Sequence, residues 1–197
     1  MLAKSYLRFY PMFMVSPRTV RITDPQVLRA LTHPLRMRLL GLLRSDGPST
    51  ASRLGARVGE SSGATSYHLR ELARYGFVED APELGTGRER WWRALHEITS
   101  WDNESFDPEL VSVLQRRIVE VRARHYNGWL DDLGTVPDIA QFADRLLHLT
   151  PEQTRQLGAD LSDVLSRWYA VSAAPGTDGT HQVVAFGDAL PVTELRL

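Results

Sequence analysis

The stretch Ser61-Ser-Gly-Ala-Thr-Ser-Tyr-His-Leu-Arg-Glu-Leu-Ala-Arg-Tyr-Gly76 decides how the whole sequence is interpreted. Its apolar residues recur at helical spacing, and Gly76 is a natural helix stop because glycine readily adopts the left-handed conformation. Opposite the apolar stripe, the first two turns carry short hydroxyls, a glycine and a histidine instead of long charged side chains. Short polar side chains let a helix come close to another surface and still exchange hydrogen bonds with it. The stretch therefore predicts a helix that fits the major groove of DNA.

Helical spacing assigns two faces to this stretch. The residues expected on the inward arc are Ala64, Tyr67, Leu69, Leu72 and Ala73. The residues expected mostly off that arc are Ser61, Ser62, Thr65, Ser66, His68 and Arg70. A serine-rich helix start whose hydroxyls only cap free N–H groups explains the same residues equally well. The neighbouring segments have to decide between these two interpretations.

Three helices are predicted before this stretch. An Asp-Pro pair begins the first, over residues 26–31, because proline is favoured in the first turn of a helix. Thr32-His33-Pro34 breaks this helix, and apolar residues at helical spacing predict the second over residues 35–44. The third helix is capped by Ser49 or Thr50 and ends at Val58. A short glycine-containing turn then leads into the next helix, and two short helices joined in this way form a helix-turn-helix.

After Gly76 the pattern changes from helical to extended. Residues 77–79 predict one strand and residues 88–95 predict its returning partner, with a loop rich in Pro and Gly between them. The tip of this hairpin carries Arg88 and Arg90. A hairpin of this kind beside a helix-turn-helix can act as a wing on the DNA backbone or in the minor groove. A merely solubilising hairpin is the alternative.

Three motifs carry a family resemblance: Leu31-Thr-His-Pro-Leu-Arg-Met-Arg-Leu-Leu40, Ser66-Tyr-His-Leu-Arg-Glu-Leu-Ala-Arg-Tyr-Gly-Phe-Val78 and Gly87-Arg-Glu-Arg-Trp-Trp-Arg93. Over about residues 24–95 the chain resembles the winged-helix domain of ArsR-type bacterial transcription factors. The resemblance implies a dimeric repressor with helix 61–75 in the major groove. Together with the helix pattern, it assigns DNA contacts to Thr50, Ser61, Ser62, Thr65, Ser66, His68, Arg70, Arg88 and Arg90.

The sequence departs from one branch of that family. Members that sense metals through thiolates carry a cysteine pair in the helix before the recognition helix, whereas this chain has Thr50-Ala-Ser-Arg-Leu54 there and no cysteine at all. Another family mode uses histidine and carboxylates, but His125 has poor same-face spacing from Glu120. We therefore predict no metal and no cofactor. Control by a small molecule, or by a metal bound without thiolates, stays open as an alternative.

Charge is distributed unevenly along the 197 residues. Residues 17–95 have a net charge of +5 and residues 96–197 have one of −8, although the whole chain carries only −1. A basic part joined to an acidic part is typical of a DNA-binding module attached to a partner-facing module. The lack of cysteine fits a reducing compartment, and no apolar run approaches the length of a membrane span. We expect a cytoplasmic protein with no membrane partner.

Three regions are expected along the chain. Residues 1–16 form a loosely ordered N-terminal arm, or residues 1–13 lie before a true start of the protein at Met14. Residues 17–98 form the winged helix-turn-helix. Residues 99–197 form a helical region for dimerisation and for an effector, if there is one. The elements expected in this last region are helices over residues 109–133 and 139–148, a helix that begins at Thr150, and a short strand over residues 181–186.

These patterns predict a mainly α fold with a small β-hairpin, in the α+β class. The predicted function is that of a homodimeric repressor that binds an inverted-repeat operator in double-stranded DNA. No catalytic site is expected, because the chain has no Gly-x-Ser-x-Gly elbow and no phosphate-binding loop between a strand and a helix. The rival from another class is a winged helix used as a protein-interaction module, with the acidic half as its working surface.

Overall fold

The structure, a computed structural model, describes residues 18–85, 87, 89–135, 140–172 and 177–191. The chain divides into two compact units: one is Arg18–Ala143, and the other contains the described residues from Asp144 onward. This division differs from the boundary expected after residue 98, because the long helix that follows that point groups with the winged helix. The predicted N-terminal arm lies outside the described residues.

Helix α1 (Pro25–Ala30) begins where the Asp-Pro pair predicts, and α2 (Pro34–Ser45) begins at the proline of the Thr-His-Pro stretch between the two predicted helices. The Asp24 carboxylate caps α1 by accepting a hydrogen bond from a backbone N–H in its first turn. At α2 the cap is an imidazole: Nδ1 of His33 accepts a hydrogen bond from the N–H of Leu35 at 3.2 Å. Both caps satisfy backbone donors that have no partner inside the helix.

The predicted helix-turn-helix is present as α3 (Ala51–Val58) and α4 (Ser62–Arg74). Thr50 caps α3 and Ser61 caps α4, each through its side-chain oxygen. Between the two helices the backbone turns at Gly59, whose φ of 75° lies in the left-handed region that favours glycine. The prediction of two short helices joined by a glycine turn is confirmed.

A second glycine lets α3 come close to this turn. A Cβ atom on Gly55 would lie 2.7 Å from the carbonyl oxygen of Glu60 and 3.0 Å from Oγ1 of Thr65. The backbone N–H of Glu60 also donates to the carbonyl of Gly55 at 2.9 Å, which closes the end of α3. Gly55 therefore sets how closely the two helices approach each other.

The wing belongs to a three-stranded antiparallel sheet with the order β2-β4-β3. Strands β3 (Val78–Asp80) and β4 (Trp91–Ala94) are the predicted hairpin, with β3 shifted by one residue and β4 shorter than expected. Strand β2 (Ser49–Thr50) pairs with the other edge of β4. The sequence does not reveal this third strand, because two residues are too few for an alternating pattern. Trp92 packs into the core and Trp91 is only partly buried.

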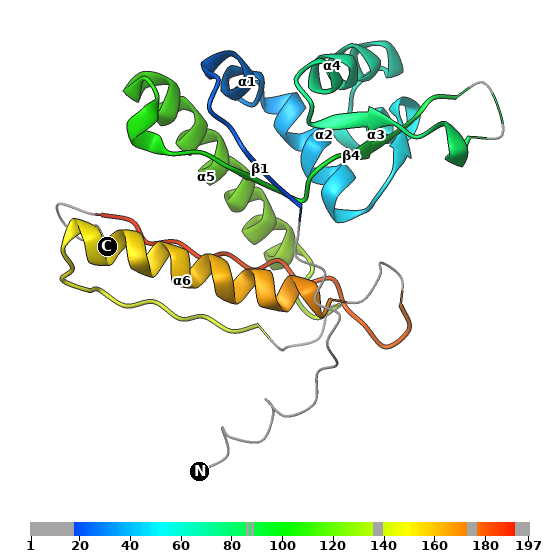
Figure 1. The fold of residues 1–197 in the computed structure, drawn as a ribbon. Helices are drawn as coiled ribbons and strands as arrows, with labels where there is room; N and C mark the ends of the chain where they lie inside the picture. The colour runs from blue at the N-terminus through cyan, green and yellow to red at the C-terminus, as the bar shows by residue number, and fades with distance from the viewer. Residues whose placement is uncertain (1–17, 86, 88, 136–139, 173–176, 192–197) are drawn as a thin grey trace. The chain divides into compact units, whose positions relative to one another are not determined.

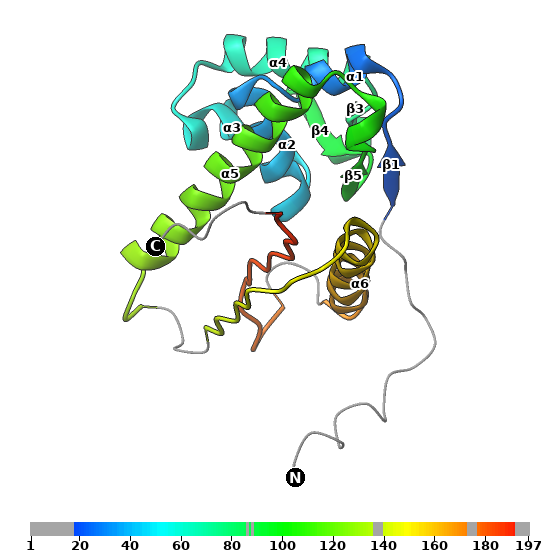
Figure 2. The ribbon, with the colours of Figure 1, turned by 90° about the vertical axis from the view of Figure 1, so that its left-hand side faces the viewer.

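Another small sheet joins the two ends of the winged helix. Strand β1 (Thr19–Arg21) runs parallel to β5 (Ile98–Ser100), and Figure 2 shows β1 along one edge of the unit. Before the strands, the guanidinium of Arg18 donates to the Glu97 carboxylate at 2.8 Å. Burial by itself would raise the pKa of Glu97, but hydrogen bonds from Arg18 bring it below its usual value. The pair therefore strengthens a contact between segments far apart in sequence.

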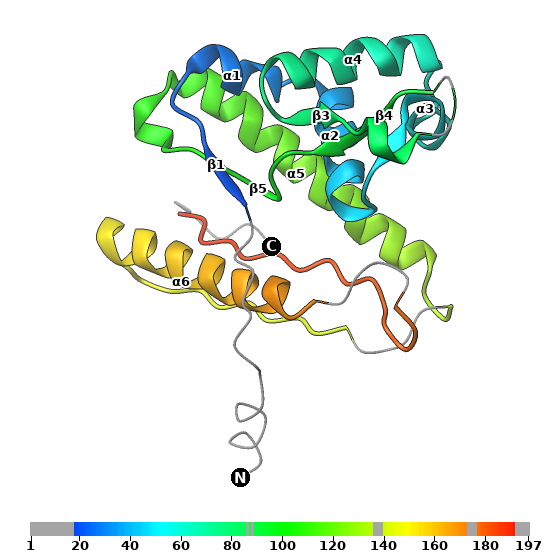
Figure 3. The ribbon, with the colours of Figure 1, turned by 45° about the vertical axis from the view of Figure 1, so that its right-hand side comes forward.

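These elements form one unit in the ribbon views (Figures 1 and 3), and they share one hydrophobic core. Leu39 of α2, Leu69 and Leu72 of α4, and Phe77 after α4 are all fully or almost fully buried in it. The long helix α5 (Pro108–Asp131) adds Leu110, Val111 and Leu114 to the same core. This packing explains why the start of α5 groups with the winged helix. The expected fold class, mainly α with a small β-hairpin, is confirmed.

The second unit contains α6 (Pro151–Ala170), which begins at the predicted capping box. The hydroxyl of Thr150 accepts from the N–H of Gln153, and the Gln153 side chain accepts from the N–H of Thr150. The backbone at Gly187 lies against Leu161 on α6. No residue of α6 is buried. Among the helices of the described residues, none is long and apolar enough to cross a membrane.

Two expected elements of the C-terminal region are absent from the residues described. The predicted helix over 139–148 is wrong, because residues 140–149 contain no helical turn. The predicted strand over 181–186 is also wrong, since residues 180–191 pair with no strand. A helix of about ten residues is marginal unless its apolar face packs, and a single strand needs a partner. Both segments have the apolar periodicity of the predicted element, but neither has the packing that would stabilise it.

Candidate nucleic-acid interface

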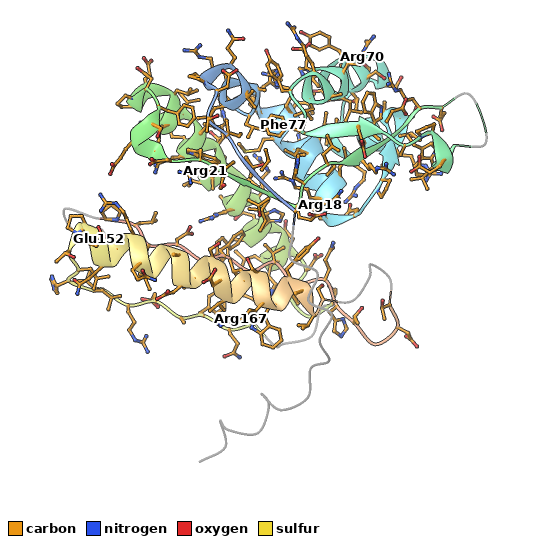
Figure 4. All side chains as sticks on the ribbon, viewed as in Figure 1. Arg18, Arg21, Arg70, Phe77, Glu152 and Arg167 are labelled. Carbon is orange, nitrogen blue, oxygen red and sulfur yellow. The ribbon has the colours of Figure 1, made fainter. Side chains whose placement is uncertain are left out.

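One face of α4 is polar and open to solvent. Ser62, Ser66 and Arg70 recur every four residues, and Tyr67 and Arg74 lie beside them. The guanidinium Nε of Arg70 donates to the carbonyl of Ser66 at 3.2 Å, so the side chain lies along its own helix. In Figure 4, Arg70 lies on the outer side of α4, whereas Phe77 lies inside the domain. This face can offer hydroxyl, phenol and guanidinium groups to a ligand.

Two residues of this helix have the opposite orientation from the one predicted. Thr65 was expected to face outward, but its side chain is fully buried, and Oγ1 donates to the carbonyl of Ser61 at 2.9 Å. Tyr67 was expected to face inward, but it is 55% exposed. A threonine hydroxyl that bonds to the carbonyl four residues before it can pack as a small apolar side chain. Thr65 therefore completes the stripe with Leu69 and Leu72, and Tyr67 is turned outward.

His68 does not share the open face either. Its ring packs against the ring of His33 with centroids 4.3 Å apart and a tilt of 39° between the ring planes, and Tyr67 meets it edge-on at 5.1 Å. The Nδ1 atom of His68 is buried and has no hydrogen-bond partner among the described residues. Burial lowers the pKa of both histidines, and the positive charge of Arg36 lowers them further. The outward, base-reading position predicted for His68 is therefore corrected to a position between α4 and the start of α2.

Three elements surround a hollow of about 370 Å³ beside this face. The start of α3, the exposed face of α4 and the wing each contribute part of its wall. The residues that line it are Thr50, Ala51, Ser52, Ser62, Ser66, Arg70, Glu89, Arg90 and Trp92. The hollow thus collects five of the nine residues expected to contact DNA, from parts of the sequence up to 40 positions apart.

The wing presents Arg90 to this hollow in a defined orientation. Its Nε donates to the Asp80 carboxylate at 2.8 Å, and its guanidinium lies over the Trp92 ring, 4.4 Å from the centroid. Because Asp80 is bound through Nε, the two terminal nitrogens can still bind a ligand. Arg93 differs, since its guanidinium is bound to Glu79 at 2.7 Å and to Glu83. The hydrogen bond to Glu79 raises the pKa of Arg93, and both carboxylates compensate its charge.

The remaining predicted residues have structural tasks or are not described. Thr50 is almost fully buried and caps α3, with Oγ1 accepting from the N–H of Arg53 at 3.4 Å. Ser61 is exposed and caps α4, with Oγ accepting from the N–H of Ala64 at 3.2 Å. Capping therefore explains these two hydroxyls, as the alternative interpretation of the serine-rich start anticipated. Arg88 lies outside the described residues.

Metal ligands do not gather in the part of the chain that the structure describes. No three His, Asp or Glu side chains there are placed to hold one ion. His125, which the sequence offers as a candidate, lies exposed on α5.

A comparison with protein-family models supports the nature of this domain. Residues 31–81 match a family model described as a helix-turn-helix domain. The match spans α2, α3, α4 and β3, so it contains the candidate face of α4. The resemblance predicted from the sequence motifs is thereby confirmed at the level of the helix-turn-helix domain. Among curated proteins, none matches the sequence.

Solved structures that match part of this chain include transcriptional regulators. The AntR antimony-specific transcriptional repressor is 22% identical, over 51% of this chain and 78% of that one, with a TM-score of 0.34. The homodimeric winged helix-turn-helix domain of a possible ArsR-family regulator from Mycobacterium bovis is 17% identical, over 63% and 88% of the chains, with a TM-score of 0.35. A possible transcriptional regulator for arsenical resistance is 28% identical, over 60% and 100%, with a TM-score of 0.32. At these scores, the fold assignment rests on the element order of the chain itself.

Proposed function

We propose that this protein is a sequence-specific DNA-binding transcriptional regulator that works as a homodimeric repressor. The observation that carries the proposal is the shared hollow, in which the start of α3, the open face of α4 and Arg90 of the wing meet. The helix-turn-helix match over residues 31–81 supports a DNA-binding role for the same elements. An inverted-repeat operator in double-stranded DNA is the expected ligand.

Helix α4 reads the bases in this proposal. Its open face carries Ser62 and Ser66 early in the helix and Arg70 two turns later, which suits a helix whose N-terminal part enters the major groove. A guanidinium can bind guanine through two hydrogen bonds, and a hydroxyl can bind either kind of base edge. Tyr67 joins this set because its ring is exposed. Thr65 leaves it because it is buried, and half-buried His68 leaves it because its ring packs against His33.

The wing and the start of α3 bind the backbone in this proposal. Arg90 is oriented by Asp80 and Trp92 so that its terminal nitrogens can bind a phosphate on the rim of the groove. The exposed hydroxyl of Ser52 lies at the first turn of α3, on the same wall of the hollow. Contacts of this kind position a protein on DNA without reading sequence, and they make binding dependent on salt.

The second half of α5 provides the surface for a second copy of the chain. After Leu114, no residue of α5 is buried, and Val119, Tyr126 and Leu130 remain exposed. These three positions follow the spacing of one helix side, at intervals of seven and four residues. Two copies related by a two-fold axis would present two α4 helices to half-sites about one helical turn apart.

A mobility-shift assay tests the proposal, on the DNA just upstream of the gene for this protein and on sequences selected from random DNA. We expect a discrete shifted band that survives nonspecific competitor and weakens with salt. The informative pair of variants is Arg70→Ala and Arg21→Ala, because both remove an exposed arginine from the same unit but only Arg70 lines the hollow (Figure 4). Arg70→Ala should weaken binding by about 10-fold or more, through about 1–3 kcal/mol per base contact.

Either of two results would overturn the proposal. Equal losses for Arg70→Ala and Arg21→Ala would show that general positive charge, not the hollow, binds DNA. A band that always disappears with competitor, on the upstream DNA and on selected sequences alike, would point to the winged helix as a protein-interaction module.

A further inference from the structure

Two histidine rings join the recognition helix to the start of α2. His33 precedes α2 and His68 lies in the middle of α4, and their ring centroids are 4.3 Å apart. The His33 ring also has a structural task that requires Nδ1 to lack a proton, and the His68 ring has a buried Nδ1. Nδ1 of His33 accepts the hydrogen bond that caps α2, and Nδ1 of His68 is buried with no partner among the described residues. We call these two rings the imidazole pair.

Charged side chains near the imidazole pair act on the pKa of its rings in both directions. Arg36, one turn into α2, lowers the pKa of both rings, and Arg117 of α5 lowers that of His33. Glu60, in the turn between α3 and α4, and Glu71 of α4 act in the opposite direction on His68. The Glu71 carboxylate also lies 3.9 Å from the Arg36 guanidinium and forms an ion pair with it. Burial, the largest influence, favours neutral rings in the folded protein.

From this geometry we propose that the imidazole pair is an acid-sensitive contact that holds α4 in its DNA-binding position. Protonation of His33 at Nδ1 removes the cap of α2, since the nitrogen can no longer accept a hydrogen bond. Protonation of both rings places two positive charges about 4 Å apart, next to Arg36 and Arg117. Acid therefore loosens α4 from α2 and releases DNA. This proposal rests on the proposed DNA-binding function and adds a form of regulation to it.

The direction of the pH effect follows from linkage. Both histidines have a lowered pKa in the folded protein, so the unfolded chain binds protons first as the pH falls through the usual histidine value of about 6.5. The stability that the neutral pair contributes is complete above that pH and is lost progressively below it. Simple electrostatics predicts the reverse for DNA affinity, because added positive charge strengthens phosphate binding. Weaker binding in acid is thus a specific sign of the imidazole pair.

The test measures two quantities on the full chain between pH 7.5 and pH 5.0: the melting temperature, and the Kd for the selected operator. The variant is the double substitution His33→Asn and His68→Gln. Asparagine is among the best N-cap residues, so it keeps the cap on α2 without a titrating group. We expect wild-type affinity to fall from pH 7.5 to pH 5.5, because protonation removes the cap of α2 and places positive charge on both rings. The double variant should lose most of this dependence.

His148→Gln is the matched control, because His148 is exposed and belongs to the other unit. It should keep the wild-type pH profile. If the double variant unfolds, the single variant His33→Asn provides the same comparison, with part of the acid effect removed. An identical pH dependence of melting temperature in wild type and variant would overturn the proposal.

The two readouts separate this proposal from the function on which it rests. If no DNA is bound specifically at any pH, the proposed function fails, and the melting temperatures still decide whether the imidazole pair titrates with folding. If DNA is bound but its affinity rises or stays constant in acid, the regulatory proposal fails and the DNA-binding function stands.

Discussion

Helices α4 and α6 are both amphipathic, and they use their apolar faces differently. In α4, Leu69 and Leu72 are fully buried in the core that also contains Phe77. In α6, no side chain is buried, and Trp168 is 66% exposed. An apolar face contributes stability only when another surface removes it from water. The apolar face of α4 therefore contributes to the free energy of unfolding of its unit, whereas the exposed apolar face of α6 contributes little.

The comparison also separates two ways of keeping a helix in place. In the winged helix, caps and glycines are integrated into the packing, as Thr50 and Gly55 show. In the second unit, the capping box of Thr150 and Gln153 is exposed and stabilises α6 locally. Substitutions of matched chemistry in the two units should therefore have different effects on cooperative unfolding.

The largest effect is expected for Phe77→Ala. The Phe77 ring is almost fully buried between α4 and the wing, so its removal leaves a cavity and loses its transfer free energy. Truncation of a buried phenylalanine costs about 3–5 kcal/mol, a large part of the stability of an ordinary domain. Denaturant unfolding followed by circular dichroism measures this loss. A loss below about 1 kcal/mol would mean that the core is not packed as described.

A smaller loss is expected for Gly55→Ala. The new Cβ atom would lie 2.7 Å from a backbone oxygen, that of Glu60, so the turn of the helix-turn-helix has to move. Overpacking of this kind costs about 1–3 kcal/mol. Gly41→Ala is the control: it lies within α2 with open space around the new Cβ, and should stabilise by about 0.5–1 kcal/mol. Thermal melts compare the stabilities of the two variants. A higher melting temperature for Gly55→Ala would refute the close approach of α3 to the Glu60 carbonyl.

A cap in each unit provides the next comparison. Thr50→Ala removes a buried cap of α3 and should lower the free energy of unfolding of the winged helix by about 1 kcal/mol. Thr150→Ala removes the exposed cap of α6 and should reduce helical signal without shifting the melting of the winged helix. Melting curves followed at the tryptophans and at the helical band separate the two effects. Equal shifts in both variants would indicate that the units unfold as one.

The smallest effect is expected for Trp168→Ala. Because the side chain is largely exposed on α6, its removal should change the free energy of unfolding by no more than about 0.5 kcal/mol. The contrast with Phe77→Ala is the sharpest form of the comparison, since both changes remove a large aromatic ring. Denaturant titration under identical conditions measures both. A loss of several kcal/mol for Trp168→Ala would show that α6 packs on a surface in the working protein.

Local signals in the sequence predicted the helices of the winged helix closely. The Asp-Pro start, the cap at Thr50 and the stop at Gly76 are all found where expected. Such signals are readable because they act over a few neighbouring residues through backbone hydrogen bonds and φ preferences. The hairpin was predicted for the same reason, whereas the pairing of β1 with β5 joins residues about 80 positions apart.

The sequence by itself determined the helix-turn-helix, its order of elements and the hydroxyl-rich composition of the recognition helix. Tertiary packing decided which of those side chains face outward. Thr65 turns inward because its hydroxyl is satisfied by the Ser61 carbonyl, Tyr67 turns outward, and His68 meets His33 across two helices. Likewise, residues 140–149 form no helix, because no neighbouring surface in the described part of the chain covers their apolar side chains. Periodicity specifies a face, but only the surfaces of neighbouring elements determine whether that face is buried.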